Sequence, residues 1–255
     1  MKLTEFDSNK KAVINAEDVV NKIEGCPETI VTCFSKKIIN KAVEIYKPEV
    51  IGFVHNANGD IPFYKLNING KRIGLIMSMV GAPAVVSQYE DLFVMGVKNI
   101  LVFGTCGVLD KSIEDCSIII PNKAVRDEGT SFHYAKSSDE IYVNSKALEK
   151  MIEYFNKRQI KYVSGKVWTT DGSYRETAKK VKKRKEENCI CVDMECSAIA
   201  ALAQFRNKDI GQFFYAADNL DSERWEPRSL ISDVEDDMKT KILNIALELA
   251  EKLYL

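Results

Sequence analysis

Hydrophobic and polar positions alternate along this chain of 255 residues with two distinct periods. Short β-branched or aromatic runs between polar turns predict strands at 29–34, 50–54, 62–68, 72–80, 99–104, 117–125, 162–169, 189–192 and 211–217. Apolar residues at three- and four-residue steps predict helices at 36–46, 84–95, 145–158, 176–187, 194–205 and 234–253. The last helix has the clearest apolar stripe, formed by Val234, Met238, Ile242, Ile245, Leu249 and Leu253.

The order of these elements predicts the fold class. Strands alternate with helices, which is typical of an α/β protein with one mostly parallel sheet and helices on both faces. No internal repeat and no low-complexity linker divides the sequence. We therefore expect a single domain over residues 1–255, with residues 1–24 as an N-terminal extension.

Charge and cysteine content exclude several classes of function. The formal net charge is −1, which argues against a nucleic-acid or anionic-membrane binder. The N-terminus is polar, and no apolar run approaches the roughly 20 residues that a membrane helix needs. The seven cysteines include no CxxC pair, and only His55 and His133 could join them at a metal. We expect a cytoplasmic protein with reduced thiols, no metal, no membrane contact and no nucleic-acid partner.

Two carboxylates follow buried strands and are the first candidates for chemistry. Glu195 follows the run at 189–192 where the chain turns into a helix, and Asp218 closes the run at 211–217. Open α/β sheets bind ligands at the carboxyl edge of their strands. Acids there can bind a hydroxyl-rich group and protonate a basic ring nitrogen. Helix stabilisation by Glu195 and a plain turn at Asp218 are the alternatives.

Two glycine-containing turns could bring the backbone close to a ligand. Gly104-Thr105-Cys106-Gly107 follows an apolar strand, although a tight turn explains it equally well. Gly81 precedes a helix whose N-terminus could face an anion, or the turn could be purely structural. Neither segment has a GxGxxG pattern or a Walker lysine, which disfavours a dinucleotide or P-loop site.

Two further polar segments have structural interpretations. Arg126 follows a buried strand and could anchor an ion pair, and His133 is interpreted as a surface or interface histidine rather than a catalytic one. The basic run at 179–185 (KKVKKRK) favours a solvated helix face over a nucleic-acid patch.

Six segments in order resemble the nucleoside phosphorylase superfamily, which includes purine nucleoside phosphorylases, uridine phosphorylases and methylthioadenosine nucleosidases. They are GAP (81–83), GTCG (104–107), AVRDEGTSFHY (124–134), WTTDGSYRET (168–177), VDMECSAIAAL (192–202) and AADN (216–219). The third and fourth look closest to the uridine-phosphorylase-like branch. The resemblance covers about residues 25–253. It implies a three-layer α/β sandwich around a mixed, partly barrel-like sheet.

The resemblance also implies an activity and site residues. The family cleaves the N-glycosidic bond of a nucleoside, and phosphorylases release free base and ribose 1-phosphate. Glu195 would bind ribose hydroxyls and favour a developing sugar cation, with Met194 under the sugar. Asp218 would protonate or hydrogen-bond N7 of a leaving purine. The other implied substrate contacts are Thr105, Cys106, Gly107, Asp171, Ser173 and Tyr174. Uridine phosphorylases usually lack an acid at the Asp218 position, so a purine is favoured and uridine is the alternative.

The phosphate site departs from the family pattern. The family's Gly-Asp-Pro-x-Arg loop is replaced by CFSKK at 33–37, and an expected arginine is replaced by Val102. The remaining candidate phosphate ligands are Thr105, Lys37, Gly81 and Arg126. An arginine at position 102 is expected to tighten phosphate binding if the pocket has room for it.

These departures leave three functional hypotheses. The first is a phosphorylase that uses phosphate as co-substrate and needs no other cofactor. The second is a phosphate-independent nucleosidase, and the third is an inactive nucleoside-binding or storage-like protein. The family completes its active sites across a subunit interface, so a homo-oligomer is implied, either a dimer or a hexamer built as a trimer of dimers. Residues 54–60 would supply the neighbour's contribution.

Overall fold

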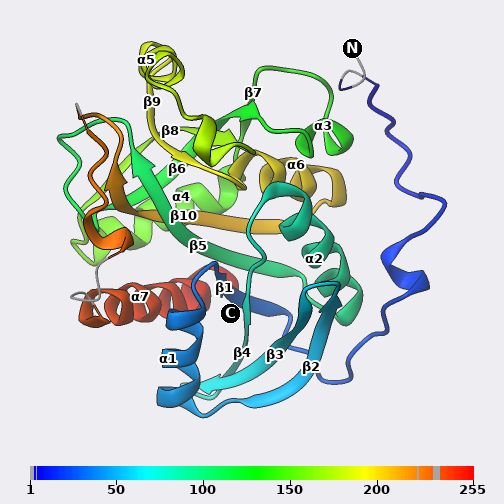
Figure 1. The fold of residues 1–255 in the computed structure, drawn as a ribbon. Coiled ribbons are helices and arrows are strands. Elements are labelled where there is room, and N and C mark those ends of the chain that lie inside the picture. The colour runs from blue at the N-terminus through cyan, green and yellow to red at the C-terminus, as the bar shows by residue number, and fades with distance from the viewer. Residues whose placement is uncertain (1–2, 4, 223, 232–235) are drawn as a thin grey trace.

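The computed structural model describes residues 3, 5–222, 224–231 and 236–255 (Figure 1). Its strands are β1 (Thr29–Cys33), β2 (Glu49–Asn56), β3 (Gly59–Ile68), β4 (Lys71–Met77), β5 (Asn99–Val108), β6 (Ile118–Asp127), β7 (Glu140–Tyr142), β8 (Tyr162–Thr170), β9 (Cys189–Asp193) and β10 (Asp209–Asn219). Its α-helices are α1 (Lys36–Tyr46), α2 (Ala82–Met95), α3 (Ser131–Tyr134), α4 (Ser145–Lys157), α5 (Ala178–Glu186), α6 (Cys196–Arg206) and α7 (Asp236–Tyr254).

The strands form one mixed sheet, part of which closes on itself. The order along the sheet is β10-β6-β8-β9-β5-β1-β4-β3-β2, and β7 pairs with β6. Because β10 also pairs with β5, the strands β5, β10, β6, β8 and β9 form a closed ring. The remaining strands β1, β4, β3 and β2 extend from this ring as an open sheet. The predicted mixed, partly barrel-like sheet is confirmed.

The sheet is less parallel than the alternation of elements predicted. Strand β1 runs parallel to β4 and β5, but β3 pairs antiparallel with both β2 and β4. Within the ring, β9 runs antiparallel to β5 and β10 runs antiparallel to β6. The prediction of a mostly parallel sheet was wrong, because consecutive hairpins and the ring closure introduce antiparallel neighbours.

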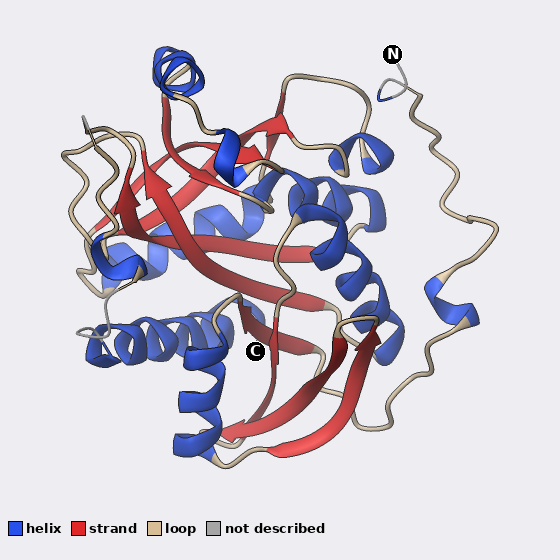
Figure 2. Ribbon diagram, viewed as in Figure 1, coloured by secondary structure: helices blue, strands red, loops and turns tan. Residues whose placement is uncertain are grey.

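Helices cover both faces of the sheet, which confirms the three-layer arrangement (Figure 2). Helices α1, α4 and α7 contribute to one apolar cluster, which includes Phe103, Phe155, Phe213 and Leu247. Helices α2 and α6 contribute to a second cluster on the other face. None of the described helices is long and apolar enough to cross a membrane. Val234, the first residue of the predicted stripe, lies outside the described residues.

Candidate active site

The two predicted acids and the GTCG segment come from three neighbouring strands, β9, β10 and β5. Gly107 of β5 lies opposite Val192 of β9 and opposite Asp218 of β10. A Cβ at Gly107 would lie 2.4 Å from Leu220 and 3.1 Å from the Asp218 carboxylate. A side chain at this position would therefore displace the Leu220 side chain and crowd the Asp218 carboxylate. The GTCG segment is more than a tight turn, since it forms the backbone between the two predicted acids.

Asp193, rather than Glu195, caps helix α6. The Asp193 carboxylate accepts hydrogen bonds from the backbone N–H of Glu195 at 2.9 Å and of Cys196 at 2.6 Å. Its other oxygen accepts from the Thr169 hydroxyl at 2.7 Å. The helix begins at Cys196, two residues later than predicted, because Asp193 takes the capping role. The Glu195 side chain is therefore not needed to stabilise the helix terminus.

The Glu195 carboxylate reaches across the fold to the loop before α2. It accepts a hydrogen bond of 2.6 Å from the backbone N–H of Gly81, which is 114 residues away in the sequence. Glu195 is only 7% exposed. Burial raises the pKa of Glu195, and the neighbouring negative charge of Asp193 raises it further. A buried carboxyl held by one backbone donor keeps acceptor positions for ligand hydroxyls.

Gly81 binds a carboxylate in this structure. Its φ of 96° lies in the left-handed region, which explains the glycine, and helix α2 begins at the next residue. The predicted role of Gly81 was contact with phosphate. Its N–H instead donates to the Glu195 carboxylate, so this donor is already engaged.

The other predicted substrate contacts, on or just after β5, β9 and β8, differ in how far they are exposed. Thr105 is exposed near the end of β5, and Met194 is half-buried between β9 and α6. Cys106 is 3% exposed, and its thiol is directed toward the backbone carbonyl of Tyr215 at 3.9 Å. Asp171 accepts a hydrogen bond of 2.9 Å from the backbone N–H of Gly129. Its negative charge contributes to the raised pKa of Glu195, which places it near that residue.

Ser173, Tyr174 and Asp218 line one cavity of about 1460 Å³. Ser173 and Tyr174 belong to a short 3₁₀ helix, η3 (Ser173–Arg175), and Tyr174 is fully exposed. Asp218 is half-buried at the end of β10 and accepts a hydrogen bond of 2.8 Å from the indole N–H of Trp225. Burial raises the pKa of Asp218, while Trp225 and the charge of Arg228 oppose that shift.

Sequence reasoning missed three residues of this region. Glu176 and Trp225 line the cavity with Asp218, and Asp193 organises the backbone beside Glu195. An Asp just before an apolar helix is a known capping signal, so Asp193 could have been recognised. Glu176 was assigned to the following helix, although it lies between η3 and α5. No local pattern marks Glu176 or Trp225 as cavity residues.

Of the proposed phosphate ligands, Arg126 is engaged by its own loop. The Arg126 guanidinium donates to the Ser131 hydroxyl at 2.8 Å, the Lys136 carbonyl at 2.7 Å and the Ser138 hydroxyl at 2.9 Å. It is 5% exposed and organises the loop after β6 through neutral hydroxyl and carbonyl oxygens, not through the predicted ion pair. Lys37 is exposed in the first turn of α1, at the carboxyl end of β1.

Val102 cannot be replaced by arginine without burying a charge. Val102 is 3% exposed and packs in the apolar cluster formed with α2 and α6. A buried unpaired guanidinium is strongly unfavourable. The predicted gain in phosphate affinity required room for an arginine at position 102, and the structure offers no such room.

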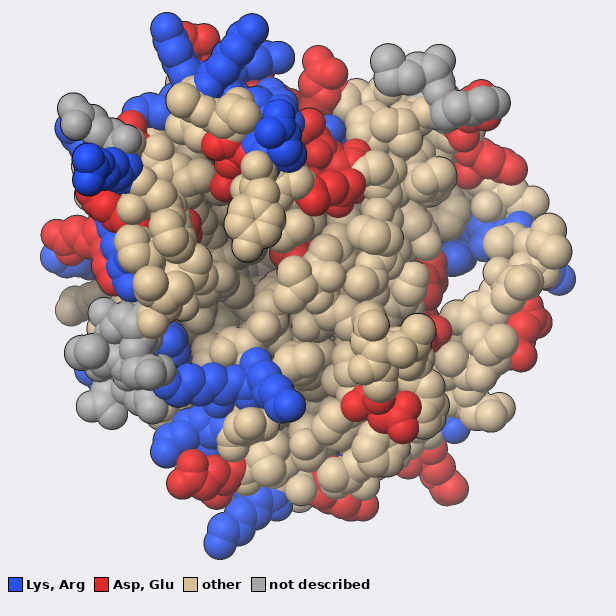
Figure 3. Space-filling model, viewed as in Figure 1, with Lys and Arg blue, Asp and Glu red and all other residues tan. Residues whose placement is uncertain are grey.

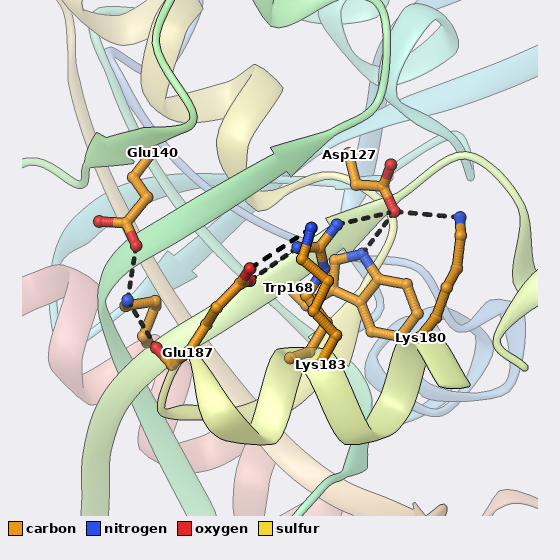
Figure 4. A network of polar contacts seen from close by, with 8 residues as sticks. Asp127, Glu140, Trp168, Lys180, Lys183 and Glu187 are labelled. Atoms are coloured by element: carbon orange, nitrogen blue, oxygen red, sulfur yellow. Dashed lines mark hydrogen bonds and ion pairs between the residues drawn. The ribbon is translucent and has the colours of Figure 1, made fainter. Parts of the chain in front are cut away.

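The basic helix α5 is held by ion pairs to neighbouring acids. Asp127 of β6 accepts from the Trp168 indole at 2.9 Å and pairs with Lys180 at 3.2 Å and with Arg184 at 3.4 Å (Figure 4). Lys183 pairs with Glu187 at 3.8 Å. On the face drawn in Figure 3, acidic side chains lie beside the basic ones over α5. These contacts fit the interpretation of a solvated helix face.

Comparisons with known proteins identify the family of this chain. A family model described as the phosphorylase superfamily matches residues 29–251. A guanosine phosphorylase of Halorubrum lacusprofundi is 23% identical over 163 residues, which cover 64% of this chain and 68% of that protein. A DeoD-type purine nucleoside phosphorylase of Bacillus cereus is 28% identical over 141 residues, which cover 52% of this chain and 58% of that protein.

Solved structures share the fold at low sequence identity. A uridine phosphorylase from Vibrio fischeri superposes with a TM-score of 0.75 at 18% identity and covers 95% of this chain and 98% of that one. An AMP nucleosidase from Bacteroides thetaiotaomicron gives 0.70 at 16% identity, with 88% and 87% coverage. The chain belongs to the phosphorylase superfamily, as the six sequence segments indicated.

Proposed function

We propose that this member of the phosphorylase superfamily cleaves the N-glycosidic bond of purine nucleosides, with phosphate as the acceptor of the ribosyl group. The products would be free base and ribose 1-phosphate, and the role would be recovery of purine bases in the cytoplasm. Relatives named guanosine phosphorylase and purine nucleoside phosphorylase support the reaction type. No metal or organic cofactor is part of the proposal.

One observation carries this proposal. The pKa values of two carboxyl groups are raised: Asp218 lines the cavity at the end of β10, and the buried Glu195 follows the end of β9, with β5 and its Gly107 paired to both strands. Carboxyls with raised pKa values in clefts are typical of catalytic sites. A nucleoside placed along Gly107 would have its sugar beside Glu195 and its base beside Asp218.

The two acids would act on opposite ends of the breaking bond. Glu195 would accept hydrogen bonds from the ribose hydroxyls, and its negative charge would stabilise the sugar as it becomes cationic. Asp218 would supply a proton to N7, so that the base leaves as a neutral molecule. Thr105, exposed on β5 between these positions, would contact the incoming phosphate.

Hydrolysis by water is the second candidate reaction. The surroundings of the residues expected to bind phosphate favour it. The Gly81 N–H is engaged by Glu195, Arg126 is engaged by its own loop, and Val102 is buried in an apolar cluster. Each charge-assisted hydrogen bond to phosphate contributes roughly 1.5–3 kcal/mol. Loss of two such contacts would weaken phosphate binding by about two to four orders of magnitude. A phosphorylase with this site would have a phosphate KM in the millimolar range.

A panel of nucleosides with and without phosphate tests these hypotheses. Purine nucleosides and uridine would be incubated with the protein, and free base would be quantified by chromatography. Phosphate-dependent release of purine is the expected result. Release without phosphate would identify a nucleosidase. No release of any base would leave only a nucleoside-binding protein, and the proposal would then be abandoned.

We also propose that the protein forms a homo-oligomer, either a dimer or a trimer of dimers. Strand β2 lies at the open edge of the sheet, and its residues Val50 and Phe53 are 46% and 44% exposed. An exposed apolar edge strand is a ready surface for pairing with another chain. We expect multi-angle light scattering at micromolar concentration to give at least twice the monomer mass. Phe53→Lys should shift the mass toward the monomer, and a wild-type monomer would contradict the proposal.

A further inference from the structure

Gln88 is a buried glutamine whose side chain holds the loop between β4 and α2. It lies on α2 and is 1% exposed. Its amide oxygen accepts a hydrogen bond of 2.9 Å from the backbone N–H of Met79. Its amide nitrogen donates a hydrogen bond of 2.8 Å to the backbone carbonyl of Met77. An amide combines an acceptor with donors, so one side chain satisfies two backbone groups of the same loop.

The end of β4 explains why a side chain is needed at this place. On one side, β1 pairs with β4 as far as Met77, and the Ser78 N–H donates to the last carbonyl of β1 at 2.9 Å. On the other side, β3 pairs with β4 only as far as Leu75. Backbone groups that are shielded from water need partners. The Gln88 amide therefore takes the place of a strand for Met77 and Met79.

This loop carries the donor that holds Glu195. Two residues after Met79, the Gly81 N–H donates to the Glu195 carboxylate at 2.6 Å. Helix α2 begins directly after Gly81, and the Val85 N–H donates to the Gly81 carbonyl at 3.1 Å. Gln88 lies on the same helix, so the loop, the helix and the Gln88 side chain form one closed ring. The position of the Gly81 N–H is thus fixed by α2 on one side and by Gln88 on the other.

We propose that Gln88 is a positioning residue, which keeps Glu195 in place for the ribose of a nucleoside. The inference rests on the proposed function, because Gln88 acts through the carboxylate assigned to the sugar. The Glu195 carboxylate is buried, and its orientation depends on the Gly81 donor. Without the Gln88 amide, the loop would move and carry this donor away. A misplacement of about 1 Å in an active site can reduce the rate by about 100-fold.

Gln88→Met tests this role, because methionine has a similar length and no amide group. We expect kcat with saturating nucleoside and phosphate to fall by about 10- to 100-fold. The KM for the nucleoside should rise by a smaller factor, because the positive charge of the sugar develops only in the transition state. An unchanged kcat in a folded Gln88→Met variant would overturn the proposal.

A double-mutant cycle with Glu195→Gln distinguishes positioning from a general weakening of the fold. If Gln88 acts through the Glu195 charge, its replacement has little left to disturb once that charge is gone. Gln88→Met should then reduce kcat by no more than about twofold in the Glu195→Gln background. A loss of equal size in both backgrounds would show that the two residues act independently, and the proposal would be wrong.

Leu92→Ala is the matched control for stability. Leu92 is fully buried on the same helix, one turn after Gln88. Its truncation should lower the melting temperature but leave kcat within about threefold wherever the variant is folded. A kcat that falls with melting temperature in both variants would contradict the proposal. If Gln88→Met does not fold, Gln88→Asn replaces it, since its amide is withdrawn by one methylene from Met77 and Met79.

Binding of an uncleavable ligand distinguishes failure of the inference from failure of the proposed function. A purine C-nucleoside joins base and sugar by a carbon–carbon bond, and calorimetry compares it with its 2′,3′-dideoxy form. We expect the wild type to prefer the form with hydroxyls by at least about tenfold, and Gln88→Met to lose most of this preference. This change in a protein that cleaves no nucleoside would support the inference and refute the proposed function. No preference in the wild type, or an unchanged preference in Gln88→Met, would refute the inference whether or not nucleosides are cleaved.

Discussion

Replacement of Glu195 by alanine is expected to reduce nucleoside turnover by on the order of 10³-fold or more. The buried carboxylate is proposed to bind the ribose hydroxyls, and the Gly81 N–H holds it in place at 2.6 Å. Its loss removes both the acceptor for ribose hydroxyls and the negative charge that stabilises the sugar cation. Initial rates with saturating nucleoside and phosphate measure the effect. A rate within threefold of the wild type would exclude this mechanism.

Glu195→Gln separates charge from positioning. The amide oxygen can still accept from Gly81, so the loop before α2 should remain in place and the variant should fold. Turnover should nevertheless fall nearly as far as in Glu195→Ala, because the amide carries no charge. Glu90 provides a matched control, since its carboxylate is 15% exposed and pairs with Arg206 at 2.8 Å. Glu90→Gln should retain turnover within threefold, and thermal melting would confirm that each variant is folded.

The sequence predicted local elements well because each depends on neighbouring residues. The helix predicted at 36–46 coincides with α1, which Ser35 caps through its hydroxyl. The start of α6 was placed two residues early, because apolar spacing does not show that Asp193 binds the backbone N–H groups of Glu195 and Cys196. The short strand β7 was not predicted, since its three residues form no distinct pattern.

The pairing of strands could not be read from the same patterns. The ring closes because β10 pairs with β5 over a long register and also meets β6. Apolar runs show that these strands are buried, but they carry no information about which strand lies beside which. We predicted mostly parallel pairs because strands alternate with helices along the chain. This alternation does not reveal the antiparallel pairs that close the ring.

The two acids proposed for the site could be selected from the sequence, whereas their long-range contacts could not. Glu195 and Asp218 were identified because acids after apolar strands are conspicuous. The contact between Glu195 and Gly81 spans 114 residues, and the cavity that Glu176 and Asp218 both line depends on how η3 meets β10. Arg126 was selected as a candidate phosphate ligand because of its motif. Its guanidinium instead donates hydrogen bonds to Ser131 and Lys136 of the loop that follows it.

Asp218→Ala is expected to reduce purine nucleoside turnover by roughly 10²–10⁴-fold, which is the usual contribution of a general acid. The reason is that an unprotonated purine anion is a poor leaving group, and Asp218 lies where N7 would be. The fold should survive, because Asp218 is half-buried at the end of β10 and its carboxylate accepts a hydrogen bond from the exposed indole of Trp225. Chromatography of released adenine measures the loss.

A riboside whose leaving group needs no proton turns this prediction into a test of mechanism. A nitrophenyl riboside departs as a stabilised phenolate, so general-acid catalysis contributes little to its cleavage. We expect Asp218→Ala to cleave this substrate within about tenfold of the wild-type rate, while Glu195→Ala fails on both substrates because the sugar cation forms in each case. If Asp218→Ala lost both activities equally, Asp218 would act by shaping the site, since loss of an acid alone cannot slow a reaction that does not use its proton.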